Sequence, residues 1–257
     1  STVFWWITGV SDRYMVAYFC SDEINGLYAA AYKIPTLLTY VVIIFNDAWK
    51  LSAVAESDNR EECAKFYSGV FKYYIAVMFS GGAILAVGAQ IFSKILFAES
   101  YFSAWIYIPI LSAATVFTAL DTFLGSAYFT VKRTGMSFWT SFIGALLNVA
   151  LNVILIPSDS IIGGAVGASI ATLTSYFAVF VIRAVTMHKF IPFKMYPVRL
   201  ILNTVMITAI AVIMTAWGSE IKGILAACAV LLISIVFNGR DIFLGCKDVL
   251  MSLKKKK

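Results

Sequence analysis

Four charged residues lie inside apolar stretches of the sequence: Asp12, Arg13, Lys33 and Asp121. An ionisable side chain at the centre of a membrane-spanning helix costs about 2.5–3.5 kcal/mol on insertion scales, so each one needs a partner or a function. Arg binds phosphate through a planar fork and Lys binds it as a point charge. A buried carboxylate pairs with a cation or exchanges a proton or Na⁺. These residue types indicate anion recognition together with charge pairing or ion coupling.

The composition places these charges in a membrane protein. Of the 257 residues, 61% are hydrophobic and 13% are charged, and the mean hydropathy is +0.86. This balance excludes an ordinary soluble domain, and it equally excludes a disordered, collagen-like or disulfide-framework chain. The single histidine, His188, leaves little scope for metal or general-base chemistry. Cys20, Cys63, Cys228 and Cys246 are too far apart for a zinc set or a redox pair, so we interpret them as free thiols.

Apolar stretches of about 20 residues predict the helices that must position the charges. One partial span and seven complete ones are predicted at roughly 1–20, 26–48, 70–92, 104–129, 135–156, 161–185, 198–217 and 221–238. No stretch alternates as barrel strands do, so the fold class is all-α, a polytopic bundle of about eight spans. The chain opens inside an apolar run, and we interpret it as a piece of a longer protein whose first span is truncated.

Basic residues are distributed unequally between the two sides of this bundle. Sixteen of the 20 Lys and Arg residues fall on the side of the carboxyl-terminal tail, and only Lys94 and Lys222 fall in loops on the other side. Basic loops remain cytoplasmic, so both ends of the segment are predicted in the cytoplasm. The basic and aromatic stretch 186–199 is predicted to be an interfacial segment. Nucleic-acid binding is rejected, because topology accounts for the basic loops and no nucleic-acid fold accompanies them.

Helical rise gives the depth of the two cations. Arg13 precedes Ser21 by eight residues and Lys33 follows Asn25 by eight, so both lie about 12 Å below the outer boundary. Two cations at one depth repel unless an anion or a carboxylate lies between them. One hypothesis is a cationic lining for an anionic substrate such as a lipid-linked phosphate. The alternatives are a structural network that includes Asp12, or a first span placed so that Asp12 and Arg13 lie near the interface.

Asp121 precedes Lys132 by eleven residues, which places it about 16 Å from the cytoplasmic boundary and near the midplane. Ion exchange and pairing with Lys33 are equally compatible with that depth. Asp47 lies near a span end, where solvation or pairing at the helix end explains it.

Other polar and small residues are explained by helix packing. Asn148 and Asn152 are four residues apart on one helical face, so hydrogen bonds between helices account for them. Small residues also recur at packing distance, namely Gly163 with Gly167, Gly164 with Ala168, and Ala171 with Ser175. Close approach of two helices explains these pairs without a ligand.

Three stretches of the sequence resemble the second half of bacterial polysaccharide flippases. They are SDRYMVAYF, then INGLYAAAYKIPTLLTYVVIIFNDAW after a short acidic turn, and LNVILIPSDSIIGGAVGASIATLTSY. The first two resemble the start of that half, and the third resembles its paired fifth and sixth helices. These flippases belong to the multidrug/oligosaccharidyl-lipid/polysaccharide exporter superfamily. The resemblance covers most of residues 1–196.

This resemblance implies a fourteen-helix transporter with two six-helix bundles around a cavity that opens alternately to each side. Residues 1–196 would form the second bundle, and 197–257 would add two helices and a basic cytoplasmic tail, with the first bundle preceding this segment. Family members move undecaprenyl-pyrophosphate-linked sugars to the outer leaflet of the bacterial cell membrane. At the matching positions, Arg13 and Lys33 would attract the pyrophosphate or acidic sugars. Asp121 matches no family motif, so a coupling role for it rests on its depth alone. Asp12 and Asp121 are the candidates for ion coupling, with H⁺ or Na⁺, or for charge pairing.

Three alternatives remain beside this polysaccharide flippase. A multidrug or lipid II exporter of the same superfamily would share the architecture and differ in the polarity of the cavity. A glycan-processing membrane enzyme usually needs a large outer loop or an intramembrane group of His and carboxylates, and the sequence has neither, so no enzymatic activity and no cofactor are expected. A non-transporting membrane subunit would leave Arg13, Lys33 and Asp121 unexplained.

Overall fold

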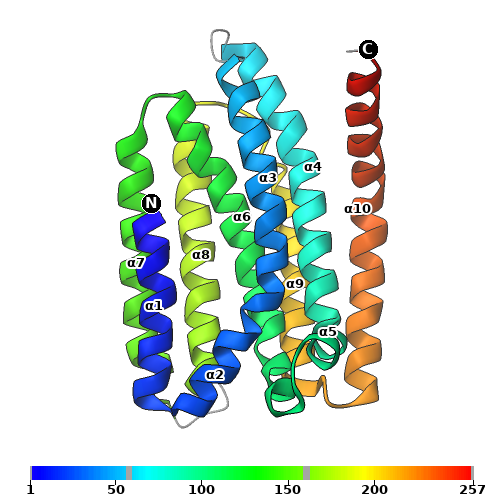
Figure 1. The fold of residues 1–257 in the computed structure, drawn as a ribbon. Helices are drawn as coiled ribbons and strands as arrows, with labels where there is room; N and C mark the ends of the chain where they lie inside the picture. The colour runs from blue at the N-terminus through cyan, green and yellow to red at the C-terminus, as the bar shows by residue number, and fades with distance from the viewer. Residues whose placement is uncertain (1, 56–59, 159–162, 256–257) are drawn as a thin grey trace.

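The structure is a computed structural model that describes residues 2–55, 60–158 and 163–255, with side chains described except in 1–7, 47–60, 159–162, 246 and 248–257. Its elements are α1 (Thr2–Phe19), α2 (Asp22–Ala31), α3 (Lys33–Ala55), α4 (Arg60–Val87), α5 (Ala89–Leu96), the 3-10 helix η1 (Glu99–Ile106), α6 (Ile108–Thr130), α7 (Thr134–Leu155), α8 (Gly164–His188), α9 (Pro197–Trp217) and α10 (Ile221–Lys255). The described ranges are helical throughout, as predicted (Figure 1). The side chain of Asp47 lies outside the described residues.

Within the described residues, seven helical segments are long and apolar enough to cross a membrane. They are Asp22–Asn46, Glu61–Val87, Ile108–Thr130, Thr134–Leu155, Gly164–His188, Pro197–Trp217 and Ile221–Gly245. The seven complete spans predicted from the sequence are therefore confirmed. The largest change is at the second of them, which begins at Glu61 instead of residue 70. Glu61 and Glu62 occupy the first turn of α4, where the helix dipole favours negative charge, so the helix starts earlier than its apolar part.

The span predicted as one helix over 26–48 is divided in the structure. The α2 helix ends at Ala31, Tyr32 follows as its C-cap, and α3 begins at Lys33. Pro35 explains the break, because its nitrogen carries no hydrogen for the carbonyl of Ala31 and its ring collides with that carbonyl in a continuous helix. The division places Tyr32 and Lys33 at the junction between the ten-residue α2 and the 23-residue α3.

The α6 helix is the centre of the bundle, and α3, α4, α8 and α9 pack around it. Its apolar side chains join a core of aromatic rings from several helices. The ring of Phe123 stacks on that of Phe71 in α4, with centroids 5.2 Å apart, and Phe117 meets Phe177 in α8 edge to face at 5.0 Å. Offset and edge-to-face contacts of this kind add stabilisation beyond that from burial of the rings, so neighbouring helices hold α6 on several sides.

The segment predicted as interfacial, 186–199, is instead built into the core for part of its length. Ile191 and Phe193 are buried with 3% and 1% of their surface exposed, and the ring of Phe193 lies 5.5 Å from that of Phe71. The prediction was wrong for these side chains because the connection between α8 and α9 folds back over α4. A buried aromatic ring loses more apolar surface to the core than it would at a membrane interface.

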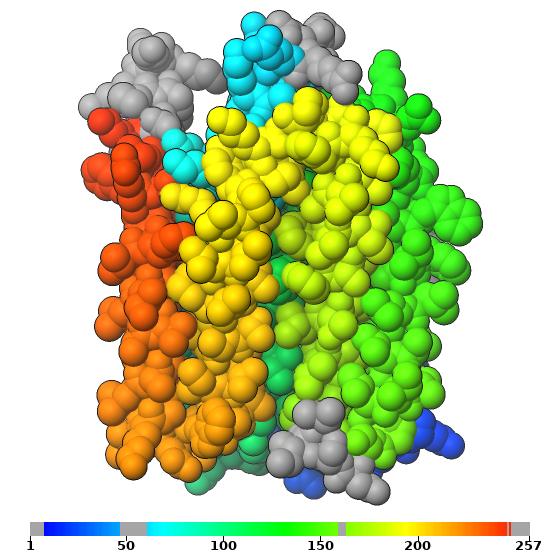
Figure 2. Space-filling view, turned by 180° about the vertical axis from the view of Figure 1, so that it is seen from behind, coloured from blue at the N-terminus to red at the C-terminus, as the bar shows by residue number. Residues whose placement is uncertain are grey.

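The connections between helices fall at the two ends of the bundle (Figure 1). The α3–α4, α6–α7 and α8–α9 connections lie at the end where the carboxyl terminus lies, and the α1–α2, α7–α8 and α9–α10 connections lie at the other. The loops with most of the basic residues therefore share one end, which we call the basic end. From behind, α7 to α10 form one continuous surface (Figure 2). Its exposed side chains include Leu146, Val205 and Val236, which are suited to contact with lipid.

Small residues allow α8 to pack closely against α6 and α7. Gly167, Ala168, Ala171 and Ser175 are buried, as the packing interpretation of their spacing expects. On the α7 side, a Cβ atom added to Gly144 would lie 2.3 Å from Cγ2 of Val179. No side chain fits at that distance, so the two helices approach each other through a glycine.

Candidate functional site

Arg13 and Lys33 line one cavity of about 440 Å³ at the end of the bundle opposite the basic end. Arg13 comes from α1 and Lys33 from the first residue of α3, and the wall between them is built from small residues of α2, including Ala29 and Ala30. Tyr101 of η1 closes the other side. The sequence-predicted cations are thus brought together, although they lie 20 residues apart in the chain.

Both cations are exposed, and neither forms an ion pair with a carboxylate in the described part of the chain. The hypothesis of a network of Asp12 with Arg13 and Lys33 was therefore wrong. Asp12 is adjacent to Arg13 in the sequence, but successive helical residues point about 100° apart, and its carboxylate faces the interior of the bundle instead. The two positive charges remain available to an anion.

The carboxylate of Asp12 is fully buried and is held by uncharged donors from three other parts of the chain. Its Oδ1 accepts a hydrogen bond from Nδ2 of Asn152 at 2.6 Å. Its Oδ2 accepts from Oγ1 of Thr172 at 2.7 Å, from the hydroxyl of Tyr32 at 3.3 Å and from that of Tyr28 at 3.4 Å. No Lys or Arg among the described residues pairs with Asp12, so neutral dipoles are the partners that the structure gives this carboxylate.

Further oxygen and nitrogen atoms beside Asp12 are left without partners. Nδ2 of Asn152 also donates to Oδ1 of Asn148 at 3.2 Å, whereas Oδ1 of Asn152 and Nδ2 of Asn148 are buried without a hydrogen bond. A carboxylate, amide oxygens and hydroxyls are hard oxygen donors, and a single carboxylate balances one positive charge. The Asp12 cluster, formed by Asp12 with Tyr28, Tyr32, Asn148, Asn152 and Thr172, therefore fits a proton or a monovalent cation.

The sequence predicted part of this cluster. The explanation of Asn148 and Asn152 by hydrogen bonds between helices is confirmed for Asn152, which bonds across to α1. Tyr28, Tyr32 and Thr172 were missed. Their types are ordinary in an apolar span, and only the assembly of α1, α2 and α8 shows that their hydroxyls meet.

Asp121 pairs with Arg183, and its predicted pairing with Lys33 was wrong. Nη1 of Arg183 lies 2.9 Å from Oδ1 of Asp121, and both side chains are at most 3% exposed. Arg183 lies close to the end of α8 and was counted among the basic residues of the nearby loop. A residue one turn from a helix end can point inwards, and position in the sequence does not reveal this.

The guanidinium of Arg183 makes four hydrogen bonds beside its ion pair and joins three helices. Nε donates to Oγ1 of Thr140 at 2.9 Å, Nη1 to the carbonyl of Asp121 at 3.0 Å, and Nη2 to Oγ of Ser141 at 2.8 Å and to the carbonyl of Ser137 at 3.2 Å. A Cβ atom at Gly125 would lie 2.3 Å from Nη1, so the glycine leaves room for the pair. These contacts make Asp121 and Arg183 a clamp between α6, α7 and α8.

A second group of charges, which the sequence did not predict, attaches α9 and α10 to α4. Asp241 of α10 is 1% exposed, and its Oδ1 lies 2.9 Å from Nζ of Lys72 in α4 while its Oδ2 pairs with Arg199 in α9. Nearby, the side chains of Asn203 and Asn238 exchange hydrogen bonds of 3.3 and 2.7 Å. Residues 1–196 and 197–257, predicted as separate parts, are therefore joined by buried polar contacts.

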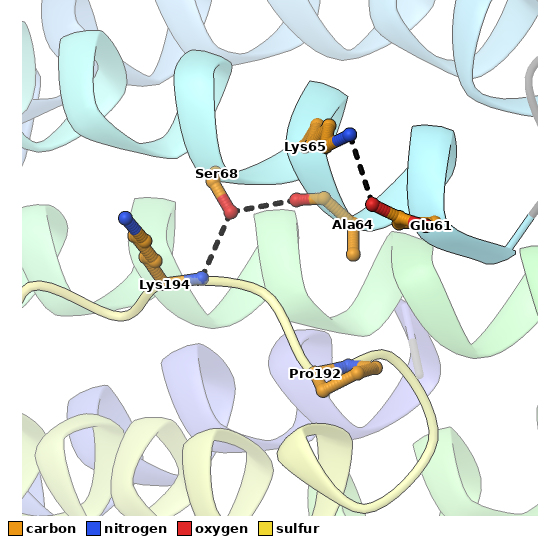
Figure 3. Close-up of a pocket in the computed structure, with 6 residues that line it drawn as sticks. All are labelled: Glu61, Ala64, Lys65, Ser68, Pro192 and Lys194. Carbon is orange, nitrogen blue, oxygen red and sulfur yellow. Dashed lines mark hydrogen bonds and ion pairs between the residues drawn. The ribbon is translucent and has the colours of Figure 1, made fainter.

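A depression of about 400 Å³ at the basic end is lined by Glu61, Ala64, Lys65, Ser68, Pro192 and Lys194 (Figure 3). Oγ of Ser68 accepts from the backbone nitrogen of Lys194 at 2.8 Å and donates to the carbonyl of Ala64 at 2.6 Å. Lys65 pairs with Glu61 at 2.9 Å on the exposed surface. These contacts fix the α8–α9 connection to α4, and they explain the depression without a ligand.

No cluster suited to a transition metal occurs among the described residues. They contain no group of three or more His, Cys, Asp and Glu side chains that could hold a metal ion. Cys20, Cys63 and Cys228 form no disulfide bond.

Comparison with known proteins supports the membrane assignment and goes no further. No protein-family model matches the chain, and no solved structure matches it. A curated relative is the "Uncharacterized membrane protein MJ1068" of Methanocaldococcus jannaschii, which is 27% identical over 191 residues. That match covers 71% of this chain and 36% of the relative, so the chain spans well under half of the relative's length.

The clamp gives a prediction about stability. Replacing Asp121 with Asn leaves the buried charge of Arg183 without its carboxylate, and breaking a buried pair in this way typically costs about 3–5 kcal/mol. We expect Asp121→Asn to lower the melting temperature in detergent and the abundance in the membrane. The exposed Asp22→Asn serves as the matched control. Equal melting temperatures for the two variants would mean that the clamp does not hold the helices together.

Proposed function

We propose that this chain is part of a flippase that moves lipid-linked oligosaccharides from the cytoplasmic to the outer leaflet of a cell membrane, as the resemblance to the polysaccharide exporters implies. The observation that carries the proposal is the cavity with two unpaired cations beside a buried carboxylate that no cation neutralises. A structural subunit needs neither feature. A transporter of an anionic substrate driven by an ion gradient needs both.

The first step of the proposed cycle is capture of the anionic linkage of the substrate. Arg13 and Lys33 attract a phosphate or pyrophosphate group, Arg by paired hydrogen bonds and Lys as a point charge. Each is free to do so because no described carboxylate competes for it. The same two charges disfavour a cationic drug, which argues against the multidrug alternative within the superfamily.

The second step couples the substrate to an ion. The Asp12 cluster and the cation cavity share their helices, since Asp12 precedes Arg13 in α1 and Tyr32 precedes Lys33 at the α2–α3 junction. Binding or release of a proton or Na⁺ at Asp12 changes the charge of the cluster and the positions that its hydroxyl donors prefer. Asp12 lies beside Arg13 on α1, and two of its donors, Tyr28 and Tyr32, lie on α2 and at the junction that leads to Lys33, so the two sites influence each other through α1 and α2. Such coupling is reciprocal between the ion and the substrate.

In the whole protein, this bundle would work against a second one. Alternating access in secondary transporters arises from motion of one bundle against another around a shared site. Residues 1–196 would supply the second bundle and 197–257 the two additional helices, with the first bundle elsewhere in the same protein. The basic end would face the cytoplasm, because cytoplasmic loops are rich in Lys and Arg.

Removal of one cavity cation tests substrate capture. Lys33→Ala removes a charged hydrogen bond to the substrate, an interaction of about 1.5–3 kcal/mol. We expect oligosaccharide export by the intact transporter to fall about ten- to a hundredfold. Abundance and melting temperature should not fall, because Lys33 is exposed and has no ion-pair partner in the described residues. Lys94→Ala, an exposed lysine of α5 outside the cavity, is the control and should export normally. Unchanged export by Lys33→Ala contradicts the proposed role.

Replacement of the buried carboxylate tests ion coupling. Asp12→Asn keeps the shape of the side chain and removes its charge, so the cluster can no longer exchange a proton or neutralise Na⁺. In sealed vesicles we expect transport that no longer responds to an imposed Na⁺ or proton gradient, with the melting temperature kept or raised. This outcome differs from that of Asp121→Asn, which should destabilise the protein. A gradient response equal to that of the unchanged protein would remove Asp12 from the coupling mechanism.

The proposed orientation is tested by thiol labelling in a variant whose native cysteines are replaced by serine. Thr134 begins α7 at the basic end, and Ser219 lies between α9 and α10 at the opposite end, and both are exposed. In intact cells we expect Ser219→Cys to react with a membrane-impermeant reagent, and Thr134→Cys to react only after permeabilisation. The reverse pattern would place the basic end outside.

A further inference from the structure

A second cavity, of about 240 Å³ and mainly apolar in its lining, lies between α3 and α6 and is separate from the cation cavity. Its polar lining consists of Thr39 and Asn46 from α3 and of Thr115, Thr118 and Thr122 from α6. These residues are spaced by three, four or seven positions on each helix, so one face of α3 and one face of α6 turn towards each other with polar groups. We call this cavity the acceptor pocket, because the threonine side chains in its wall offer acceptor oxygens.

The threonine hydroxyls of α6 have already used their hydrogens. Thr115 donates to the carbonyl of Leu111 at 2.9 Å, Thr118 to that of Ala114 at 3.0 Å, and Thr122 to that of Thr118 at 2.7 Å. Each hydroxyl has one hydrogen and two lone pairs. What the three residues offer the pocket is therefore acceptor oxygen.

Asn46 adds a stronger sign that the pocket is made for a ligand. Its side chain is buried with 5% of its surface exposed, it lines the pocket, and its Oδ1 has no hydrogen-bond partner. A buried acceptor without a partner costs about 1–3 kcal/mol. Rotation of the amide about its Cβ–Cγ bond would bring this oxygen to the pocket surface, where a donor of the ligand would remove the cost.

The chemistry of the lining selects the class of ligand. A phosphate or carboxylate brings only acceptors and negative charge, so it finds no free donor on the three α6 threonines and no cation in the lining, and only the amide nitrogen of Asn46 could pair with it. A saccharide brings several hydroxyl donors and also has apolar C–H faces, which suit Val42 and Ile43 in the same wall. The volume of about 240 Å³ leaves room for a sugar ring and is too large for one dehydrated cation.

The position of the pocket fits a substrate that is anionic at one point and neutral beyond it. Lys33 begins α3, and Thr39 and Asn46 follow it by six and thirteen residues on the same helix. At 1.5 Å per residue these residues lie about 9 and 20 Å from Lys33 along the helix axis, towards the basic end. A chain of sugars joined to a phosphate held at Lys33 would extend over this distance.

We propose that the acceptor pocket binds a neutral pyranose unit of the transported substrate, through hydroxyl donors of the sugar to Asn46, Thr118 and Thr122. This inference rests on the proposed function for the identity of the substrate, but its physical basis is separate from that of the cation cavity. The pocket then selects among sugars by which ring hydroxyls point at its oxygens, because an unmatched acceptor stays unpaired.

The test is saturation-transfer NMR on the purified 257-residue chain in detergent, with free glucose, galactose, mannose, rhamnose and N-acetylglucosamine as probes. We expect at least one of these sugars to bind, and inorganic pyrophosphate not to displace it.

The double variant Thr118→Val and Thr122→Val keeps the side-chain shape and removes both oxygens, and it should weaken sugar binding at least tenfold. Thr208→Val on the exposed face of α9 is the control and should bind as before. Asn46→Leu, which removes the unpaired acceptor without creating a new one, should weaken binding while keeping the melting temperature.

The outcomes separate this inference from the proposed function. Three results would overturn the pyranose assignment. None of the five sugars binds, or sugar binding is unchanged in the double variant and in Asn46→Leu, or Na⁺ or K⁺ displaces the sugar. Pyrophosphate binding is measured in parallel, and Lys33→Ala should weaken it without affecting sugar binding. If Lys33→Ala leaves pyrophosphate binding unchanged while the Thr118 and Thr122 variants weaken sugar binding, the proposed phosphate site in the cation cavity is wrong and the sugar site in the acceptor pocket stands.

Discussion

Charge buried among apolar helices is the constraint around which this bundle is organised, because lipid offers no water to solvate it. The chain meets the constraint differently at each buried carboxylate. Asp121 is matched by one guanidinium, Asp241 by two cations, and Asp12 by uncharged hydroxyls and amides. The first two arrangements are closed, since each anion has its counter-charge. The third stays open to an incoming positive charge, and it lies beside two cations that are open to an incoming negative one.

This difference separates the parts of the bundle that hold the fold from those that can change state. The Asp121–Arg183 clamp joins α6, α7 and α8 at the centre, and the Asp241 group ties α9 and α10 to α4. The ion pairs and hydrogen bonds of these two groups cross between helices and hold those helices in place. The Asp12 cluster lies at the edge of this part, where α1 and α2 meet α7 and α8. A change of charge there acts on α1 and α2, which neither of these two groups holds.

The sequence predicted the all-α fold and the seven complete spans because both follow from composition and the length of apolar stretches. It also selected Arg13 and Lys33, because a matched depth on adjacent helices is a property of helical rise alone. Partners were harder to predict. Lys33 was a reasonable partner for Asp121 by depth, but depth does not say which way a side chain points, and Arg183 is nearer in three dimensions. Tyr28, Tyr32 and Thr172 carry no signal in a single sequence, because hydroxyl residues are common where helices merely pack.

Because Pro35 interrupts the helix between α2 and α3, α2 can rotate as a short unit about a pivot at Tyr32. Ten residues make a rod about 15 Å long, so a swing of about 10° displaces its far end by about 2.6 Å. Tyr32 lies at the pivot and scarcely moves, whereas Gly26, six residues away in the wall of the cation cavity, travels further than Ala29, which is three residues away. The width of that cavity is thus governed by a single angle. A continuous helix over 22–55 would have to bend or shift along its whole length to produce the same opening.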